Sequence, residues 1–331
     1  MRRFTSVNPV SLDDAVSRLD TSVAERLDER AAVVGGGSDL LGMMKDDLAT
    51  PNVLVTLRGV GGLDEVRVDE SGERLRIGGL VTLTALSRHP LLNTSYRVLT
   101  EAAGSAATPQ IRNVATIAGN LCQRPWCWYF RQGFPCYKHG GNRCFSRTGE
   151  NQFNAIFAGG PSYIVHPSDT APALIALGAR FQIVGPNGSR WVPASEFFVL
   201  PRTDISRENV LETNEILSEI ALPVAASGMR STYEKLLDRE AWTHAVVSVA
   251  LALDMDGDII RQASVVLGGV APIPWQVFEV EEMLAGQRLT DALAREAGRA
   301  AVARAQPLSK NGYKVTLTEN LVRRTLRSLA A

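Results

Sequence analysis

The feature of this sequence that most constrains its fold is a short stretch, residues 118–145, that holds all four of its cysteines. Cys122, Cys127, Cys136 and Cys144 fall within 23 consecutive positions of a 331-residue chain, with the spacing C-x4-C-x8-C-x7-C. Thiolates gathered on one loop can pair as disulfides, bind zinc or hold an iron–sulfur cluster. We refer to residues 118–145 as the cysteine segment.

Of these three options, the sequence favours an iron–sulfur cluster. Disulfide frameworks are typical of small secreted scaffolds, whereas this chain is long, 45% hydrophobic and starts without the apolar region of a secretory signal. Structural zinc sites usually use C-x2-C pairs, which this spacing lacks. Wide and uneven intervals suit a [4Fe–4S] cubane, in which each iron takes its own thiolate, and zinc is the remaining alternative. Five aromatic residues would pack around the cluster or serve as ordinary core: Trp126, Trp128, Tyr129, Phe130 and Phe134.

Charge and hydropathy argue against several functional classes. Lys+Arg and Asp+Glu are both 35, so the formal net charge is zero, unlike that of a general nucleic-acid surface or a polybasic membrane anchor. No apolar run approaches the roughly 20 residues of a membrane-spanning helix. We therefore expect a cytoplasmic protein of two or three domains, with no nucleic-acid partner and no membrane insertion. An export signal on a partner would make it periplasmic instead.

A predicted strand runs directly into three glycines near the start of the chain. Residues 31–34 are apolar and are followed by GGGSD at 35–39. Backbone N–H groups in such a loop can cradle a phosphate or pyrophosphate, and a simple glycine turn is the alternative. Leu40 stands where a Rossmann fingerprint needs glycine or alanine, and Met43 and Met44 stand where a P-loop needs Lys and Ser/Thr. A cradle of neither type leaves the flavin dinucleotide sites of other folds.

A second glycine-bearing loop, residues 108–120, leads directly into the cysteine segment. Around the two loops the sequence predicts helices at 11–20, 82–87, 93–107 and 170–177, and strands at 31–34, 53–57, 75–77, 180–184 and 190–193. The first domain should end near Pro223.

The remainder of the chain changes character. Strands are expected at 245–255 and 258–267 around an Asp256-Gly257 hairpin turn, followed by helices at about 275–285, 290–305 and 312–330. Strands followed by helices indicate an α+β domain. The basic residues of the last helix are expected on a solvated face or subunit rim: Lys314, Arg323, Arg324 and Arg327.

Four motifs together resemble one family. VVGGGSDLL at 33–41, ATIAGN at 115–120, HPSD at 166–169 and GYKVTLTENLVRRTL at 312–326 resemble the FAD-binding middle subunit of the xanthine dehydrogenase family of molybdenum hydroxylases. The resemblance covers essentially the whole chain. It implies an α+β fold, with a vanillyl-alcohol-oxidase-type (PCMH-type) FAD-binding domain at 1–223 and a small α+β domain at 224–331.

The resemblance also implies which residues hold FAD. The first loop would wrap the pyrophosphate, the second would approach it from the other side, and the aspartate of HPSD would lie by the flavin. The implied FAD contacts are Val33, Val34, Gly35, Gly36, Gly37, Ser38, Asp39, Leu40, Leu41, Thr108, Ala115, Gly119, Asn120, Asp169 and, as a weaker candidate, Lys235. No residue of this chain is expected to be catalytic.

Most members of the family lack a cysteine insert after the second loop. In having one, this chain resembles two subgroups with an extra [4Fe–4S] cluster, the periplasmic-type aldehyde oxidoreductases and the 4-hydroxybenzoyl-CoA reductases. The implied role is electron transfer between the molybdenum and [2Fe–2S] centres of a large and a small partner subunit and an external acceptor, through FAD and this cluster, in a heterotrimer acting on an aldehyde, N-heterocycle or aryl-CoA.

Two other functions remain open at this stage. One is a free-standing FAD-dependent oxidase of the same fold, and the other is a zinc-bearing scaffold, which would leave both glycine loops unexplained. Some such oxidases bind FAD covalently through histidine, but none of the four histidines lies in the first glycine loop. His166 and His244 are predicted to be structural.

Overall fold

The structure, a computed structural model, describes residues 1–20, 31–239 and 244–330. A small parallel sheet at one end of the molecule carries the first glycine loop. Its strand order is β1 (Thr5–Val7), β3 (Val53–Thr56) and β2 (Ala32–Val34). Helix α1 (Leu12–Asp20) packs beside this sheet, and α2 (Leu40–Lys45) follows the glycine loop. The predictions for 11–20, 31–34 and 53–57 are confirmed to within a few residues.

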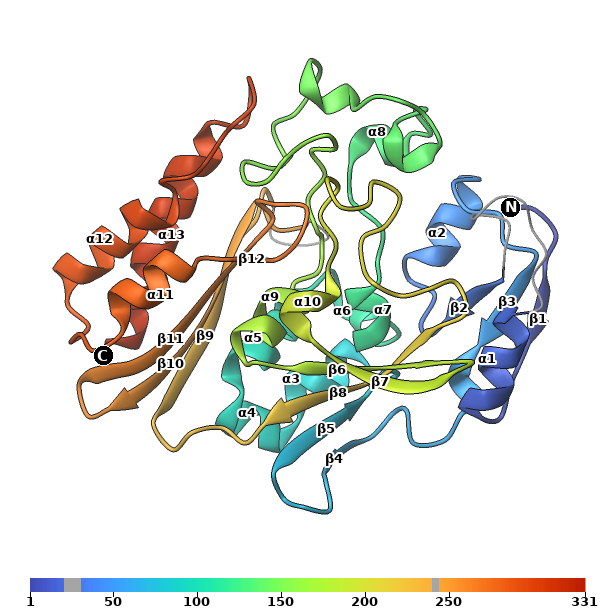
Figure 1. The fold of residues 1–331 in the computed structure, drawn as a ribbon, viewed down its shortest axis with the longest axis horizontal. Coiled ribbons are helices and arrows are strands. Elements are labelled where there is room, and N and C mark those ends of the chain that lie inside the picture. The colour runs from blue at the N-terminus through green and yellow to red at the C-terminus, as the bar shows by residue number, and fades with distance from the viewer. Residues whose placement is uncertain (21–30, 240–243, 331) are drawn as a thin grey trace.

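A five-stranded antiparallel sheet forms the middle of the molecule (Figure 1). Its order is β4 (Val66–Val68), β5 (Arg74–Gly78), β8 (Ile216–Pro223), β6 (Arg180–Gly185) and β7 (Gly188–Pro193). Strand β8 arrives from a distant part of the chain and lies between β5 and β6, with seven of its eight residues buried. The sequence predicted β5, β6 and β7 but not β8, whose pairing partners lie more than 30 residues away.

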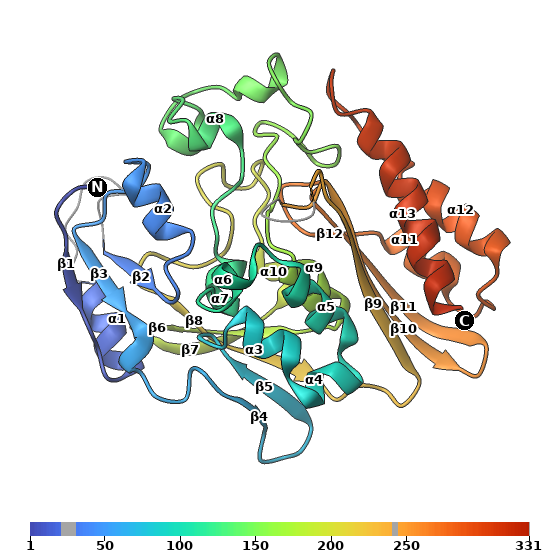
Figure 2. The same cartoon turned by 180° about the vertical axis from the view of Figure 1, so that it is seen from behind.

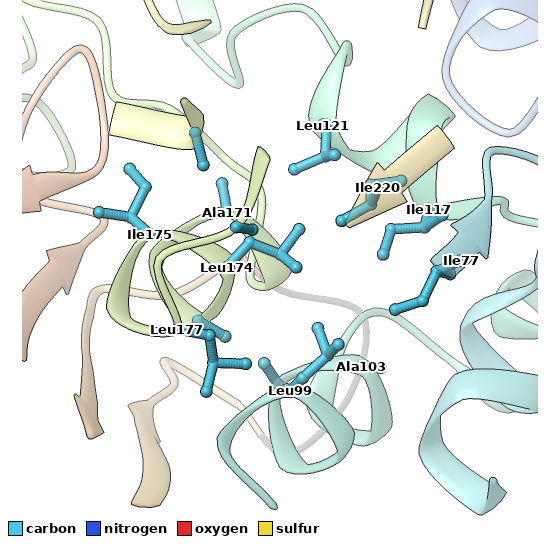
Figure 3. Close-up of a cluster of buried hydrophobic side chains, with 14 of the residues drawn as sticks. Ile77, Leu99, Ala103, Ile117, Leu121, Ala171, Leu174, Ile175, Leu177 and Ile220 are labelled. Atoms are coloured by element: carbon cyan, nitrogen blue, oxygen red, sulfur yellow. The ribbon is translucent and has the colours of Figure 1, made fainter. Parts of the chain in front are cut away.

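A group of helices fills the space between this sheet and the third one. It consists of α3 (Leu83–Arg88), α4 (Pro90–Ser95), α5 (Arg97–Ser105), α6 (Pro109–Arg112), α7 (Ile117–Leu121), α9 (Thr170–Ala176) and α10 (Ala194–Phe197). Figure 3 shows that Ile117 and Leu121 of α7 face Ile77, Ile220 and Leu174 in the largest core cluster. The second glycine loop is therefore anchored in the core by the helix that ends it.

The third sheet belongs to the C-terminal part of the chain. Its order is β12 (Trp275–Gln276), β11 (Ile259–Gly268), β10 (Val247–Asp256) and β9 (Met229–Leu236), all antiparallel. Helices α11 (Phe278–Leu284), α12 (Asp291–Ala301) and α13 (Tyr313–Leu329) cover its outer face, as Figure 2 shows from behind. The predicted order of strands then helices is confirmed. The helix expected to begin at 275 begins at 278, because residues 275–276 pair with β11 instead.

The last helix also corrects an expectation about Lys314. This side chain is fully buried, and its Nζ donates to the carbonyl oxygens of Phe153 (2.9 Å), Asn154 (3.2 Å) and Gly269 (2.7 Å). The protonated form of Lys314 has three donors, so the three carbonyl acceptors satisfy it without a carboxylate. Burial without a countercharge nevertheless favours the neutral amine and lowers the pKa of Lys314 to about 7. Lys314 therefore fixes α13 to the chain that follows the cysteine segment, whereas Arg324 and Arg327 are exposed as expected.

Candidate functional site

The two glycine loops meet backbone to backbone. A Cβ added to Gly36 would lie 1.8 Å from the carbonyl oxygen of Val114 and 3.1 Å from the Cα of Ala115, and one added to Gly35 would lie 2.7 Å from the Thr116 Oγ1. Such distances leave no room for a side chain at Gly36. The close approach that requires glycine here is thus between the two loops themselves.

Threonine caps hold the second loop in shape. Thr116 accepts a hydrogen bond from the Gly119 N–H (3.2 Å) and caps α7, while Thr108 accepts from the Ile111 N–H (3.4 Å) and caps α6. N-cap threonines satisfy N–H groups that the helix itself leaves unpaired. The Ala115 carbonyl accepts from the Leu83 N–H (2.9 Å), which ties the loop to α3.

Two cavities lie along the loops. The first, of about 230 Å³, is lined by Ser38, Asp39, Leu83, Ala106, Ala107, Ile111, Ala115, Gly119, Asn120, Gln123, Trp126, Pro167, Asp169, Arg239 and His244. The second, of about 180 Å³, is lined by residues 32–40 with Met43, Thr116, Gly119, Cys122, Gln123 and Arg124. They share Ser38, Asp39, Gly119 and Gln123, so they form one groove. A glycine-lined end and a wider, partly apolar end fit the pyrophosphate and the ring of a flavin dinucleotide.

Most of the predicted FAD contacts gather along this groove. Residues 33–40, Ala115, Gly119, Asn120 and Asp169 line it. Leu41, Thr108 and Lys235, which are all within the described residues, are not among the lining residues. Thr108 instead caps α6, and Leu41 is partly exposed.

A buried ion pair fixes the aspartate of the HPSD motif. One carboxylate oxygen of Asp169 accepts from the Tyr233 hydroxyl (2.7 Å), and the other is 2.7 Å from the Lys235 Nζ. Lys235 also donates to the Ser105 carbonyl (3.2 Å). Burial and the negative charge of Asp169 raise the pKa of Tyr233 well above its ordinary value, so Tyr233 stays a hydrogen-bond donor. Lys235 thus acts behind Asp169 and helps to hold its carboxylate at the groove.

The neighbouring polar residues form a second small network. The Asn120 side-chain oxygen accepts from the hydroxyls of Ser168 (2.6 Å) and Thr170 (2.7 Å). This network joins the end of the second glycine loop to the start of α9. Asn120 is therefore bonded to the two residues that flank Asp169 in the sequence, and this holds both Asn120 and Asp169 in fixed positions.

The groove also contains residues that the sequence pattern missed. Trp126 and His244 meet in its wall with ring centroids 4.9 Å apart, and burial lowers the pKa of His244. Trp126 was expected to shield a cluster, and nothing in the local sequence of His244 marks it as a site residue. His166, by contrast, is buried against Phe198, and burial lowers its pKa to about 3.

The cysteine segment contains the short helix α8 (Trp128–Arg131) and a 3-10 turn at Tyr137–His139, and a second 3-10 turn, Phe145–Arg147, begins at its last residue. Figure 1 shows it above the helices of the first domain. Two of the five aromatics behave as expected, since Phe130 is buried and Tyr129 is partly so. Trp126, Trp128 and Phe134 are 41–47% exposed, which corrects the expectation that all five shield a metal centre.

All four cysteines of the described chain are free thiols. Cys127 and Cys136 are buried in one apolar cluster, whereas Cys122 packs against the main core and lines the glycine end of the groove. Burial raises the pKa of Cys136, and the neighbouring Cys127 and Cys144 raise it further. Burial alone raises the pKa of Cys122 to about 12. Among the described residues, no three His, Cys, Asp or Glu side chains converge closely enough to hold a metal ion.

A cluster of charged side chains attaches the cysteine segment to residues 207–208. The Lys138 Nζ lies 2.8 Å from Glu208 and donates to the Arg207 carbonyl (2.6 Å), and Arg124 lies 2.9 Å from the other oxygen of Glu208. Burial lowers the pKa of Lys138, and the charge of Glu208 opposes that shift. The segment is thus attached to the body of the first domain by buried charges as well as by apolar packing.

A groove between two glycine loops, with bare backbone at one end and a fixed carboxylate at the other, defines a flavin-nucleotide-binding protein. Comparison with known sequences identifies the family. Residues 2–225 match the model of the FAD-binding domain in molybdopterin dehydrogenase, and residues 231–329 match the CO dehydrogenase flavoprotein C-terminal domain. The chain therefore belongs to the FAD-binding medium subunits of the molybdenum hydroxylases.

Individual relatives agree with this assignment. The chain is 34% identical over 307 residues to the aldehyde oxidoreductase FAD-binding subunit PaoB of Escherichia coli, covering 91% of each protein. It is 28% identical to the carbon monoxide dehydrogenase medium chain of Hydrogenophaga pseudoflava, covering 98% of this chain and 96% of that one. A solved carbon monoxide dehydrogenase from the same organism superposes with a TM-score of 0.78 at 27% identity, over 99% of this chain and 97% of that one. The expected fold class is confirmed.

None of the helices in the described ranges combines the length and the apolar character that crossing a bilayer requires.

Proposed function

We propose that this chain is the electron-transferring flavin subunit of a molybdenum hydroxylase. The observation that carries the proposal is the groove along the two glycine loops, lined by residues 33–40 at one end and by Asn120 and Asp169 at the other. When bound, FAD accepts and releases electrons singly or in pairs, which suits a link between one-electron centres and a two-electron acceptor. The groove, rather than any catalytic side chain, is this chain's contribution.

Each part of the groove has a distinct task in this proposal. The backbone at 35–37 would contact the pyrophosphate, and the wider cavity would receive the isoalloxazine ring. The carboxylate of Asp169 is held by Lys235 and Tyr233, so its position does not depend on the flavin. The proposed FAD contacts remain those that the family resemblance implies. They include Leu41, Thr108 and Lys235, which do not line the groove in this structure and would have to approach it for a contact to form.

We also propose that Cys122, Cys127, Cys136 and Cys144 hold one [4Fe–4S] cluster. Its support is the confinement of all four cysteines to one segment and the burial of Cys127 and Cys136 in one apolar cluster. Bringing Cys122 into the set requires the segment to move, since Cys122 packs against the main core whereas Cys127 and Cys136 lie in a separate apolar cluster. Metal binding that orders a loop is common when the loop supplies every ligand.

Metal analysis tests the cluster separately from the flavin. Anaerobically purified protein should contain about four irons and four labile sulfides per chain. Zinc without sulfide would refute the cluster and, with it, the relation to the subgroups that carry one, but would leave the FAD assignment intact. Ser at any one of the four positions should weaken or abolish the cluster.

The proposed partners are a large subunit with the molybdenum cofactor and a small subunit with [2Fe–2S] clusters, plus an external electron acceptor. Two of the relatives are themselves named as a "medium chain" and an "FAD-binding subunit", which supports a place in such an assembly. We further propose a division into domains at 1–223 and 224–331 and a cytoplasmic location unless a partner exports the complex. The proposed substrate is an aldehyde, as the name of the relative from Escherichia coli suggests, with an N-heterocycle or an aryl-CoA as the alternatives.

A free-standing FAD oxidase is the competing function. Purification of the full chain from its native source separates the two possibilities. We expect flavin bands with a broad iron–sulfur shoulder, co-purifying large and small subunits, and no substrate turnover by this chain alone. Turnover by the isolated chain would refute the proposed relay and favour the oxidase.

A further inference from the structure

Asp39 connects the first glycine loop to the cysteine segment through an ion pair and a hydrogen bond. One of its carboxylate oxygens lies 2.8 Å from the Arg131 Nη2, and the other accepts a hydrogen bond from the backbone N–H of Arg124 (2.9 Å). These partners stand 92 and 85 positions further along the chain. The side chains of Asp39 and Arg131 are only 25% and 14% exposed, so solvent screens the pair weakly.

Arg131 extends this contact within the segment. Its Nε donates to the Pro125 carbonyl (3.0 Å) and its Nη2 to the Arg124 carbonyl (2.8 Å). Its guanidinium also lies over the ring of Trp126, 5.3 Å from the centroid. One arginine therefore gathers the backbone at 124–125 and the aromatic wall of the groove, and Asp39 holds that arginine to the glycine loop.

Among the described residues, the carboxylate of Asp39 does not form the hydrogen bond that is usual for an aspartate at the start of a helix. Asp39 is the N-cap of α2, where aspartate ordinarily accepts from an N–H of its own helix. Within the described residues its side chain makes no such cap hydrogen bond. Removing its charge should therefore affect the cysteine segment without uncapping α2.

The location of this contact connects the two proposed cofactor sites. Asp39 lines both cavities of the groove, and Arg124 lines the glycine end. The held backbone at 124–125 lies between Cys122 and Cys127. We propose that Asp39 is a positioning residue that couples the order of the cysteine segment to occupancy of the flavin groove; this inference rests on the function proposed above.

Because coupling between two sites is reciprocal, flavin binding should order the segment, and loss of the contact should weaken flavin binding. The test uses the full-length chain, freed of flavin and titrated with FAD, with amide hydrogen exchange as a second measurement. In the wild type, FAD should slow exchange at 123–131. D39N should abolish that protection and weaken FAD binding by roughly tenfold.

R131Q removes the same contact from the other side and guards against a folding defect in either variant. It should reproduce the D39N result, and the double variant should be no worse than either single one. D46N is the matched control, since Asp46 is an exposed aspartate at the other end of α2. The inference is overturned if D39N weakens FAD binding but leaves the exchange at 123–131 unchanged, and if R131Q changes neither measurement. Asp39 would then only contact the flavin. A wild-type chain that binds no FAD would instead refute the proposed function.

Discussion

Replacing Gly36 with alanine should separate the two glycine loops and cost the protein most of its affinity for FAD. The new Cβ would lie 1.8 Å from the Val114 carbonyl oxygen and 2.6 Å from its carbonyl carbon. Both are backbone atoms, so no side-chain rotation relieves the clash. Restoring an ordinary contact distance requires the loops to move apart by about 1–2 Å.

Overpacking of this kind costs about 1–3 kcal/mol. If that strain is relieved only when the groove opens, the Kd for FAD should rise by roughly 5- to 150-fold. The assay is titration of the flavin-free, full-length chain with FAD, followed by the change in flavin fluorescence, with thermal unfolding measured in parallel.

Gly42 offers a matched control in the helix that follows. In the described part of the chain nothing lies within 4 Å of a Cβ placed there, and the residue is exposed. G42A should leave the Kd unchanged and stabilise the chain by about 0.5–1 kcal/mol, because alanine is favoured over glycine within a helix. A G36A chain that binds FAD with the wild-type Kd would refute the reasoning that the contact between the loops shapes the groove.

Two further predictions concern buried lysines, each measured by urea unfolding of the flavin-free chain. K235M should destabilise the fold by about 3–5 kcal/mol, because it leaves the Asp169 carboxylate buried without its countercharge. Y233F, which removes one hydrogen bond to that carboxylate, should cost about 1.5–3 kcal/mol. A smaller effect for K235M than for Y233F would contradict this order. Burial lowers the pKa of Lys314 from 10.5 to about 7, so between these pH values the unfolded chain binds a proton that the folded chain does not. The free energy of unfolding should then rise with pH by up to about 1.4 kcal/mol per unit. K314M should lose this slope, whereas K310M, which replaces an exposed lysine, should retain it. Equal slopes in the wild type, K314M and K310M would show that Lys314 stays charged.

The sequence was sufficient where local patterns determine the structure. The strand that runs into GGGSD and the hairpin around Asp256-Gly257 depend on residues close together in the chain, and each lies where it was predicted. The stretch at 108–120 was predicted only as a glycine-bearing loop, and the structure adds the short helices α6 and α7 there. Most of the groove follows from the same two loops. Their mutual contact was not predictable, because the distance between Gly36 and Val114 is set by the whole first domain.

Long-range packing explains the errors. Strand β8 was missed because its partners come from residues 74–78 and 180–184. Lys314 was placed on a solvated face by its charge, yet it shares the buried face of α13 with Thr318, Leu321 and Val322. That spacing was a usable signal, since residues four and seven positions apart lie on one side of a helix. The pairing of Asp39 with Arg131 had no sequence signal at all.

The groove along the two glycine loops is expected to bind FAD without a covalent bond. The most direct measurement is acid extraction of the purified full-length chain, with chromatographic identification of the flavin in the supernatant and in the precipitate. We predict about one FAD per chain, all of it released, as expected for a cofactor held by noncovalent contacts alone. A chain without flavin, or flavin that stays with the precipitated protein, would contradict the account.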